Sequence, residues 1–257
     1  MVKYKVNKRA KEINLVSNSK RIVFLIHGYT GSPTDFNKLP FLLHKKLKSN
    51  VKVVLLKGHG TNVSDLNNFK SFEDYRNQVE DEFLKIYNKK RDIVVGGYSF
   101  GGQLALYLAS KYKVKGVFSI SAPYPLSFFL TSKPLALLCM IKKEWKKPLP
   151  KKEIKMRKNA FYYMHMPGHT LHILRHGYKT LKKVLPNVKA PLLLINSKED
   201  IWIPSRSAHL LSKKAGSVKK EIHIIDHKGH NLFYSNKKKE IYSKIINFLS
   251  SVYNESK

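Results

Sequence analysis

The stretch that decides the fold of this chain reads Ile93-Val94-Val95-Gly96-Gly97-Tyr98-Ser99-Phe100-Gly101-Gly102-Gln103-Leu104-Ala105-Leu106. An apolar run typical of a short buried strand passes directly into a pattern typical of a helix. Between them lies Gly-x-Ser-x-Gly, in which the glycines leave room for a sharp turn and the serine adopts a sparsely populated backbone conformation. The pentapeptide alone is a weak signal, but its strand and helix context predicts a nucleophile elbow at Ser99.

Apolar runs like the one before Ser99 recur along the chain, with helical patterns between them. The runs cover residues 21–26, 51–56, 93–97, 117–120, 191–195 and 221–225, and the helical patterns cover 35–48, 71–88, 102–112, 205–214 and 240–252. Continuous apolar runs are typical of strands that are buried on both faces. The alternation therefore predicts an α/β fold, with a mostly parallel sheet and helices on both of its faces.

The alternation lapses between residues 123 and 187, where apolar segments, a basic cluster and two prolines precede a helical pattern. We expect one domain, with a core of residues 1–122 and 188–257 and a helical cap or lid formed by residues 123–187. An insertion at this point would stand above the strand ends where ligands bind. The apolar segments 126–130 and 135–141 have two interpretations: they line an acyl pocket, or they belong to a cap helix that only packs on the core.

The charge of the chain is extreme, because 49 Lys and Arg oppose 17 Asp and Glu among 257 residues, for a net charge of +32. Such a surface attracts anions, including nucleic acids and acidic membranes. The lysines are spread from Lys3 to Lys257 without a nucleic-acid recognition motif, so we expect no specific nucleic-acid partner. Solvated faces and weak association with anionic membrane surfaces are the remaining interpretations.

The single cysteine, Cys139, rules out a disulfide within the chain and is compatible with a reducing compartment. The basic start has no apolar core of a signal peptide, and no run of 18 apolar residues is present. A cytoplasmic location is therefore expected. The oligomeric state is left open.

A serine nucleophile requires a base, and the base requires an acid that holds its tautomer. After Ser99 the chain contains two aspartates, Asp200 and Asp226, and we favour Asp200 because it lies in a loop at the end of a predicted strand. Glu199 and Asp226 stay as alternatives. We favour His230 as the base because Gly229 allows its loop to fold over the sheet edge. The other candidate, His227, has a similar location but no preceding glycine.

Acyl transfer also requires N–H donors for the oxygen that becomes negatively charged. One predicted donor is the backbone N–H of Phe100, which follows the serine at a helix N-terminus. The other is the backbone N–H of Tyr29, in the glycine-containing loop 27–31 after a predicted strand. An ordinary glycine turn is the alternative interpretation of this loop.

Five motifs occur together in a fixed order: His27-Gly28-Tyr29-Thr30-Gly31-Ser32, Lys57-Gly58-His59-Gly60, Gly97-Tyr98-Ser99-Phe100-Gly101-Gly102, Ser197-Lys198-Glu199-Asp200-Ile201-Trp202-Ile203-Pro204 and Gly229-His230. Together they resemble the α/β-hydrolase carboxylesterase and monoacylglycerol-lipase-like family, including small thermostable carboxylesterases of bacilli. The resemblance implies Ser99 as nucleophile, Asp200 as acid, His230 as base, and Tyr29 and Phe100 as oxyanion hole. It implies neither a metal nor an organic cofactor.

The motifs together predict a serine carboxylesterase that hydrolyses short-to-medium acyl esters through an acyl-enzyme intermediate. A lysophospholipase or monoacylglycerol lipase acting at anionic membranes is the nearest alternative. A peptidase or a thioesterase of the same fold would share the same triad. A non-catalytic basic binding protein is the alternative from a different functional class.

Overall fold

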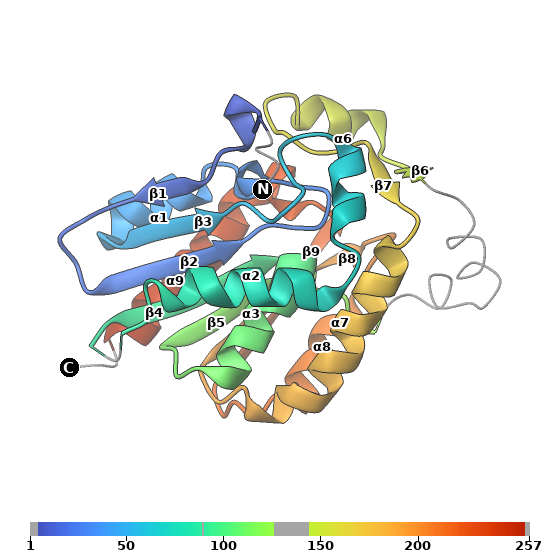
Figure 1. Cartoon of the computed structure of the whole chain (residues 1–257). Helices are drawn as coiled ribbons and strands as arrows, with labels where there is room; N and C mark the ends of the chain where they lie inside the picture. Colours follow the sequence, from blue (N-terminus) through green and yellow to red (C-terminus); the bar gives the residue numbers. More distant parts are fainter. Residues whose placement is uncertain (1–4, 89, 126–143, 255–257) are drawn as a thin grey trace.

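The computed structural model describes residues 5–88, 90–125 and 144–254. Among these residues, seven strands form one sheet in the order β1-β3-β2-β4-β5-β8-β9 (Figure 1). They are β1 (Ile13–Leu15), β2 (Arg21–Ile26), β3 (Asn50–Val54), β4 (Asp92–Tyr98), β5 (Gly116–Ile120), β8 (Leu192–Glu199) and β9 (Lys220–Lys228). Only β1 pairs in the antiparallel sense in this sheet. The predicted mostly parallel sheet is confirmed. Strand β1 was not predicted, because three residues are too few to give a recognisable sequence pattern.

Helices cover both faces of the sheet (Figure 1). The helices that cover the sheet are α1 (Leu39–Leu47), α2 (Phe72–Leu84), α3 (Phe100–Lys111), α7 (Thr170–Val184), α8 (Arg206–Lys214) and α9 (Lys238–Asn254), and a further helix, α6 (Lys151–Met156), lies in the segment between β5 and β8. Two buried clusters separate the faces: α1 and α9 contribute to one cluster, and α2, α3, α7 and α8 contribute to the other. Val23 of β2 packs in the first cluster and Phe24 in the second, which explains the continuous apolar run of this strand.

The helix predicted over residues 35–48 is two elements in the structure. A 3-10 helix, η2 (Pro33–Phe36), is followed by Asn37, whose φ is 51°, and α1 begins two residues after Asn37 with Pro40 in its first turn. Proline is tolerated there because the first N–H groups of a helix have no intrahelical partner. The break leaves Asp35 outside α1, with a fully buried side chain that reappears at the pocket described below.

The chain leaves the sheet after β5 and returns at β8. We call the described residues 144–187 between these strands the cap segment. It contains β6 (Glu144–Lys146) paired in antiparallel sense with β7 (His165–Pro167), followed by α7 and the 3-10 helix η4 (Leu185–Asn187), with α6 between the two strands. The pair β6–β7 was not predicted, again because the strands are very short. The segments 126–130 and 135–141, which were interpreted either as the lining of an acyl pocket or as a cap helix packed on the core, lie outside the described residues, as does Cys139.

No helix in the described ranges has both the length and the apolar character that crossing a bilayer requires.

Candidate active site

Ser99 lies at the junction of β4 and α3, with φ 52° and ψ −118°. Such a conformation is costly for a residue with a side chain and marks functional sites. The glycines on either side are required by packing, because a Cβ at Gly97 would lie 2.0 Å from the Gly101 oxygen, and a Cβ at Gly101 would lie 2.0 Å from the Ile26 oxygen. The sharp turn therefore requires glycine at both flanking positions of Gly-x-Ser-x-Gly, because any larger residue would clash with the backbone.

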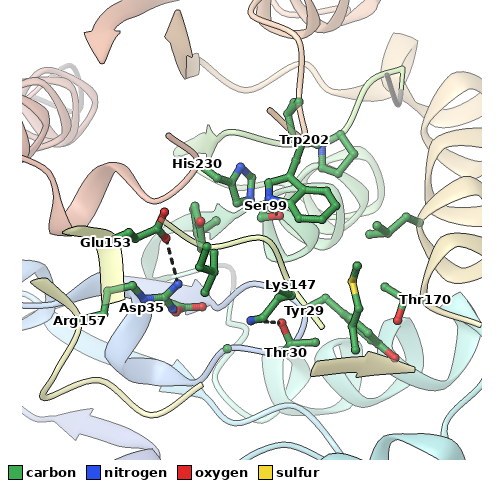
Figure 2. A pocket seen from close by; sticks show the side chains of 17 residues that line it. Tyr29, Thr30, Asp35, Ser99, Lys147, Glu153, Arg157, Thr170, Trp202 and His230 are labelled. Carbon is green, nitrogen blue, oxygen red and sulfur yellow. Dashed lines mark hydrogen bonds and ion pairs between the residues drawn. The ribbon is translucent and has the colours of Figure 1, made fainter. Parts of the chain in front are cut away.

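Three predicted side chains meet at this turn. His230 Nε2 is 3.0 Å from Ser99 Oγ (Figure 2). On the other side of the ring, His230 Nδ1 is 2.6 Å from Asp200 Oδ2. The other oxygen of Asp200 accepts the N–H groups of Trp202 and Ile203, at 2.8 and 3.1 Å. A carboxylate beside Nδ1 holds the proton there, so the lone pair of Nε2 faces the serine hydroxyl. The arrangement orients a base toward an alcohol.

The charge on His230 is governed by two opposing effects. Burial lowers the pKa of this imidazole, and the Asp200 carboxylate raises it by charge attraction and hydrogen bonding. The carboxylate prevails, so the pKa lies above its ordinary value. The Asp200 carboxylate therefore favours the protonated form of His230.

The alternative residues do not join this group. The side chain of Asp226 is 81% exposed and lies 3.8 Å from the ammonium of Lys198 at the surface. Glu199 is exposed at the end of β8, and its carbonyl accepts the Gly229 N–H at 3.0 Å. Gly229 has φ 135°, a conformation suited to glycine, and it turns the chain toward the serine immediately before His230.

Loop 27–31 is held by two buried histidines. The Leu56 N–H donates to His27 Nε2 at 3.0 Å, and His27 Nδ1 donates to the Gly28 carbonyl at 2.8 Å. The Thr30 N–H donates to His59 Nε2 at 3.1 Å, and His59 Nδ1 donates to the Lys57 carbonyl at 2.9 Å. Each ring accepts one N–H, so each must be neutral. Burial lowers the pKa of His59 to about 4 and lowers that of His27 well below its ordinary value, consistent with this role.

The two residues predicted to supply oxyanion donors are neighbours. The rings of Tyr29 and Phe100 meet edge to face with centroids 5.5 Å apart. Phe100 is the first residue of α3, where a backbone N–H has no intrahelical acceptor. Tyr29 lies between Gly28 and Thr30, both of which are anchored by hydrogen bonds of loop 27–31. Tyr29 lines the pocket described below, and Phe100 directly follows Ser99, which lines it too. Their role as donors stays a prediction.

A pocket opens beside Ser99 and His230, with an apolar and a charged part (Figure 2). Its apolar lining comes from Pro123, Leu149, Met166, Leu174, Trp202 and Ile203. Its charged lining comes from Asp35, Lys147, Glu153 and Arg157. One part of the pocket can therefore accept an acyl chain, and the other can accept polar groups.

The charged lining joins the cap segment to the core. Arg157 Nη2 is 2.9 Å from Asp35 Oδ1, and Arg157 Nη1 is 3.3 Å from Glu153 Oε1. Lys147 Nζ donates to Thr30 Oγ1 at 3.0 Å, and burial followed by the charge of Arg157 lowers the pKa of Lys147 to about 7. These residues were not predicted from the sequence, because lysines in a cap without recognisable motifs resemble a solvated surface. No sequence signal links Asp35 to Arg157.

The known proteins that this chain resembles include lipases and other lipolytic enzymes. The chain is 28% identical over 206 residues to a thermostable monoacylglycerol lipase from Bacillus sp. strain H-257, a match that covers 78% of each chain. A solved structure of the metagenome-derived lipolytic enzymes LipS and LipT matches with a TM-score of 0.85 at 23% identity, covering 96% of this chain and 100% of that one. The monoacylglycerol lipase of Paleococcus ferrophilus matches with a TM-score of 0.77 at 17% identity, covering 94% and 98%. At such identities the structures show a shared fold.

The family comparison covers most of the chain. Residues 17–237 match the family described as serine aminopeptidase, S33. This range extends from just before β2 to the start of α9 and includes all five motifs of the sequence analysis. Because the match spans well over half of its residues, the chain belongs to the serine aminopeptidase S33 family and has the α/β-hydrolase fold.

Proposed function

We propose that this protein is a serine carboxylesterase that hydrolyses short-to-medium acyl esters. The observation that carries the proposal is the hydrogen-bonded series Ser99, His230 and Asp200, at 3.0 and 2.6 Å, beside a pocket with an apolar part. The backbone of Ser99 gives further support, because its φ of 52° and ψ of −118° lie outside the allowed left-handed helical region, and strain of this kind concentrates at functional sites.

The reaction that we propose has two steps. Ser99 Oγ attacks the ester carbonyl while its proton moves to His230 Nε2, and the N–H groups of Tyr29 and Phe100 bind the oxygen that becomes negative. The tetrahedral intermediate collapses, His230 gives the proton to the leaving alkoxide, and the alcohol departs from the acyl-enzyme. Water then attacks the acyl group as His230 takes one of its protons. That proton returns to Ser99 Oγ when the carboxylic acid is released.

A monoacylglycerol lipase or lysophospholipase activity is the second candidate. It is favoured by the relative named a thermostable monoacylglycerol lipase and by a pocket that has both apolar and charged lining. The net charge of +32 would promote contact with anionic lipid surfaces, where such substrates reside. The family description names an aminopeptidase, so peptide substrates belong in the same comparison.

The test is a substrate panel with wild-type protein and Ser99→Ala. The panel contains p-nitrophenyl esters of two to twelve acyl carbons, a monoacylglycerol, a lysophosphatidylcholine, an acyl thioester and an aminoacyl p-nitroanilide. We expect ester hydrolysis by the wild type and none by the variant, together with labelling of Ser99 by a fluorophosphonate. Full activity in a folded Ser99→Ala protein would refute the proposal, and a protein that neither hydrolyses nor is labelled would be a binding protein.

Two further expectations are proposals of the same kind. We propose that residues 1–122 and 188–257 form the core and residues 123–187 form the cap, and that the protein is cytoplasmic.

We also propose weak association of the protein with anionic membrane surfaces. To test it, co-sedimentation with vesicles of phosphatidylglycerol and phosphatidylcholine is compared at low and high salt. Binding that depends on phosphatidylglycerol and weakens with salt supports surface association. Binding that salt leaves unchanged contradicts an electrostatic origin.

A further inference from the structure

Gly28 directly precedes Tyr29 in loop 27–31, and as a glycine it leaves the backbone free at this point. The peptide that contains the Tyr29 N–H also contains the Gly28 carbonyl, which accepts from His27 Nδ1 at 2.8 Å and from the Gly31 N–H at 3.1 Å. Because a peptide unit is planar, these bonds set the direction of the Tyr29 N–H. The peptide on the other side of Gly28 needs its own anchor, since glycine itself restricts φ and ψ very little.

Asp35 supplies that second anchor. Its Oδ2 accepts the Gly28 N–H at 3.2 Å, so both peptides that flank Gly28 are held. The carboxylate also packs tightly inside the loop, because a Cβ at Gly31 would lie 1.8 Å from Oδ2. The Asp35 side chain is only 1% exposed. A carboxylate in such a place would be too costly without a partner for its charge.

The partner comes from the cap segment. Arg157 follows α6, and its Nη2 is 2.9 Å from Asp35 Oδ1, across 122 residues of sequence. The guanidinium lies over the ring of Tyr162 at 3.9 Å from the centroid, which fixes its plane. The cap also contacts loop 27–31 directly: the Tyr163 N–H donates to the Thr30 carbonyl at 2.8 Å, and Lys147 Nζ donates to Thr30 Oγ1 at 3.0 Å. The cap and the loop are therefore one hydrogen-bonded unit.

We propose that Asp35, held by Arg157 of the cap segment, is a positioning residue that fixes the Tyr29 N–H in the direction needed to bind the oxyanion. The inference rests on the proposed function, because an oxyanion forms only if Ser99 attacks a carbonyl. Asp35 acts through the Gly28 backbone. Arg157 acts through Asp35, so the cap contributes to turnover by holding a loop of the core.

The kinetic test compares Asp35→Ala, Asp35→Asn and the double variant Asp35→Asn/Arg157→Gln with the wild type. Loss of a well-placed oxyanion donor costs about 10²–10³-fold in kcat, and misplacement costs up to about 10²-fold, so we expect kcat of Asp35→Ala to fall about 10²-fold. KM should change by less than about threefold, because the affected interaction forms in the transition state. The double variant should recover part of the kcat that Asp35→Asn loses. The asparagine oxygen can still accept the Gly28 N–H, and the glutamine at position 157 gives the asparagine amide a neutral hydrogen-bond partner.

A boronic acid that forms a tetrahedral adduct with Ser99 gives a readout that general destabilisation would not move. Its affinity should fall by the same factor as kcat. The matched control is Asp74→Asn, because Asp74 also accepts a backbone N–H, that of Ser71 at 3.0 Å, but at the start of α2. This control should lower the melting temperature and leave kcat unchanged. If Asp35→Ala does not fold, the test uses Arg157→Lys instead. We expect this variant to lose less kcat than Asp35→Ala, and to lose boronate affinity by the same factor as kcat.

Amide hydrogen exchange separates failure of this inference from failure of the proposed function. In the wild type the Thr30 N–H is bonded to His59, and it should exchange faster in the Asp35 variants as the loop loosens. If the wild type hydrolyses no ester, the proposed function fails, and Thr30 exchange still reports whether Asp35 holds the loop. Unchanged Thr30 exchange, or a kcat within twofold of wild type in Asp35→Ala, overturns the inference.

Discussion

Acidification should destabilise this protein through His59. The ring is 2% exposed and accepts the Thr30 N–H at 3.1 Å, which it can do only while Nε2 carries no proton. Burial lowers the pKa of His59 from its ordinary value of 6.5 to about 4 in the folded protein. Between these two values the unfolded chain binds a proton that the folded protein does not bind. The stability that His59 contributes is therefore fully present above pH 6.5 and is lost as the pH falls toward 4.

The size of this effect follows from the two pKa values. A difference of one pKa unit corresponds to about 1.4 kcal/mol, so a change from 6.5 to about 4 gives about 3 kcal/mol. This amount is a large fraction of the 5–15 kcal/mol that typically separates folded from unfolded states. His27 adds to the loss in the same direction, because burial and the neighbouring His59 lower its pKa too.

Urea unfolding at a series of pH values from 7.5 to 4 measures the effect. The wild type is compared with His59→Gln, which cannot titrate, and with His165→Gln, whose side chain is 45% exposed in the wild type. We expect His59→Gln to be less stable at pH 7 but to lose about 3 kcal/mol less than the wild type on acidification. His165→Gln should follow the wild type. The reasoning is wrong if the His59 ring titrates near pH 6.5 in the NMR spectrum of the folded protein, or if both variants share the wild-type pH dependence.

Three more predictions concern the turn, the base and the pocket. Gly101→Ala should destabilise the protein by about 3 kcal/mol or more, because its Cβ would lie 2.0 Å from a backbone oxygen, whereas Gly116→Ala, 3.3 Å from the Phe248 ring, should cost far less in a thermal melt. Activity should fall as the pH drops through a His230 pKa above 6.5, and in Asp200→Asn this limb of the profile should shift to lower pH while kcat falls by roughly 10⁴-fold. KM for anionic esters should rise as the pH increases through about 7, where Lys147 loses its charge, and Lys147→Met should abolish that rise; equal pH profiles in the two proteins would contradict it.

The parallel strands could be predicted because each is buried on both faces and leaves a continuous apolar run in the sequence. β1 and the pair β6–β7 have three residues each, too few for any period to register. The start of α1 was placed too early because Asp35 and Phe36 fit a helical pattern, and the break at Asn37 depends on a positive φ that composition does not reveal. Local signals thus located the sheet and failed where a backbone angle or a tertiary contact decides.

The same division holds for the candidate site. Ser99, Asp200 and His230 each lie just beyond a predicted strand, and carboxyl ends of parallel strands share one edge of a sheet, so their convergence could be expected from order alone. The Asp35–Arg157 pair has no such rule, since the cap is not part of the repeating pattern. Only the fold shows that an arginine 122 residues away reaches the loop.

The charged residues of the chain fall into two groups, the paired charges near the pocket and the exposed lysines of the surface. Acidic residues are scarce, yet Asp35, Glu153 and Asp200 all border the pocket region or its histidine, and each has a partner at hydrogen-bond distance. Arg157 faces two of these carboxylates, Asp35 and Glu153, and Lys147 is the second basic group of the same pocket lining. Salt at physiological concentrations screens exposed charges strongly and buried pairs much less. A salt dependence of activity toward lipid vesicles would consequently arise from the lysine-rich surface, whereas a salt-independent change in kcat would point to the paired groups of the pocket.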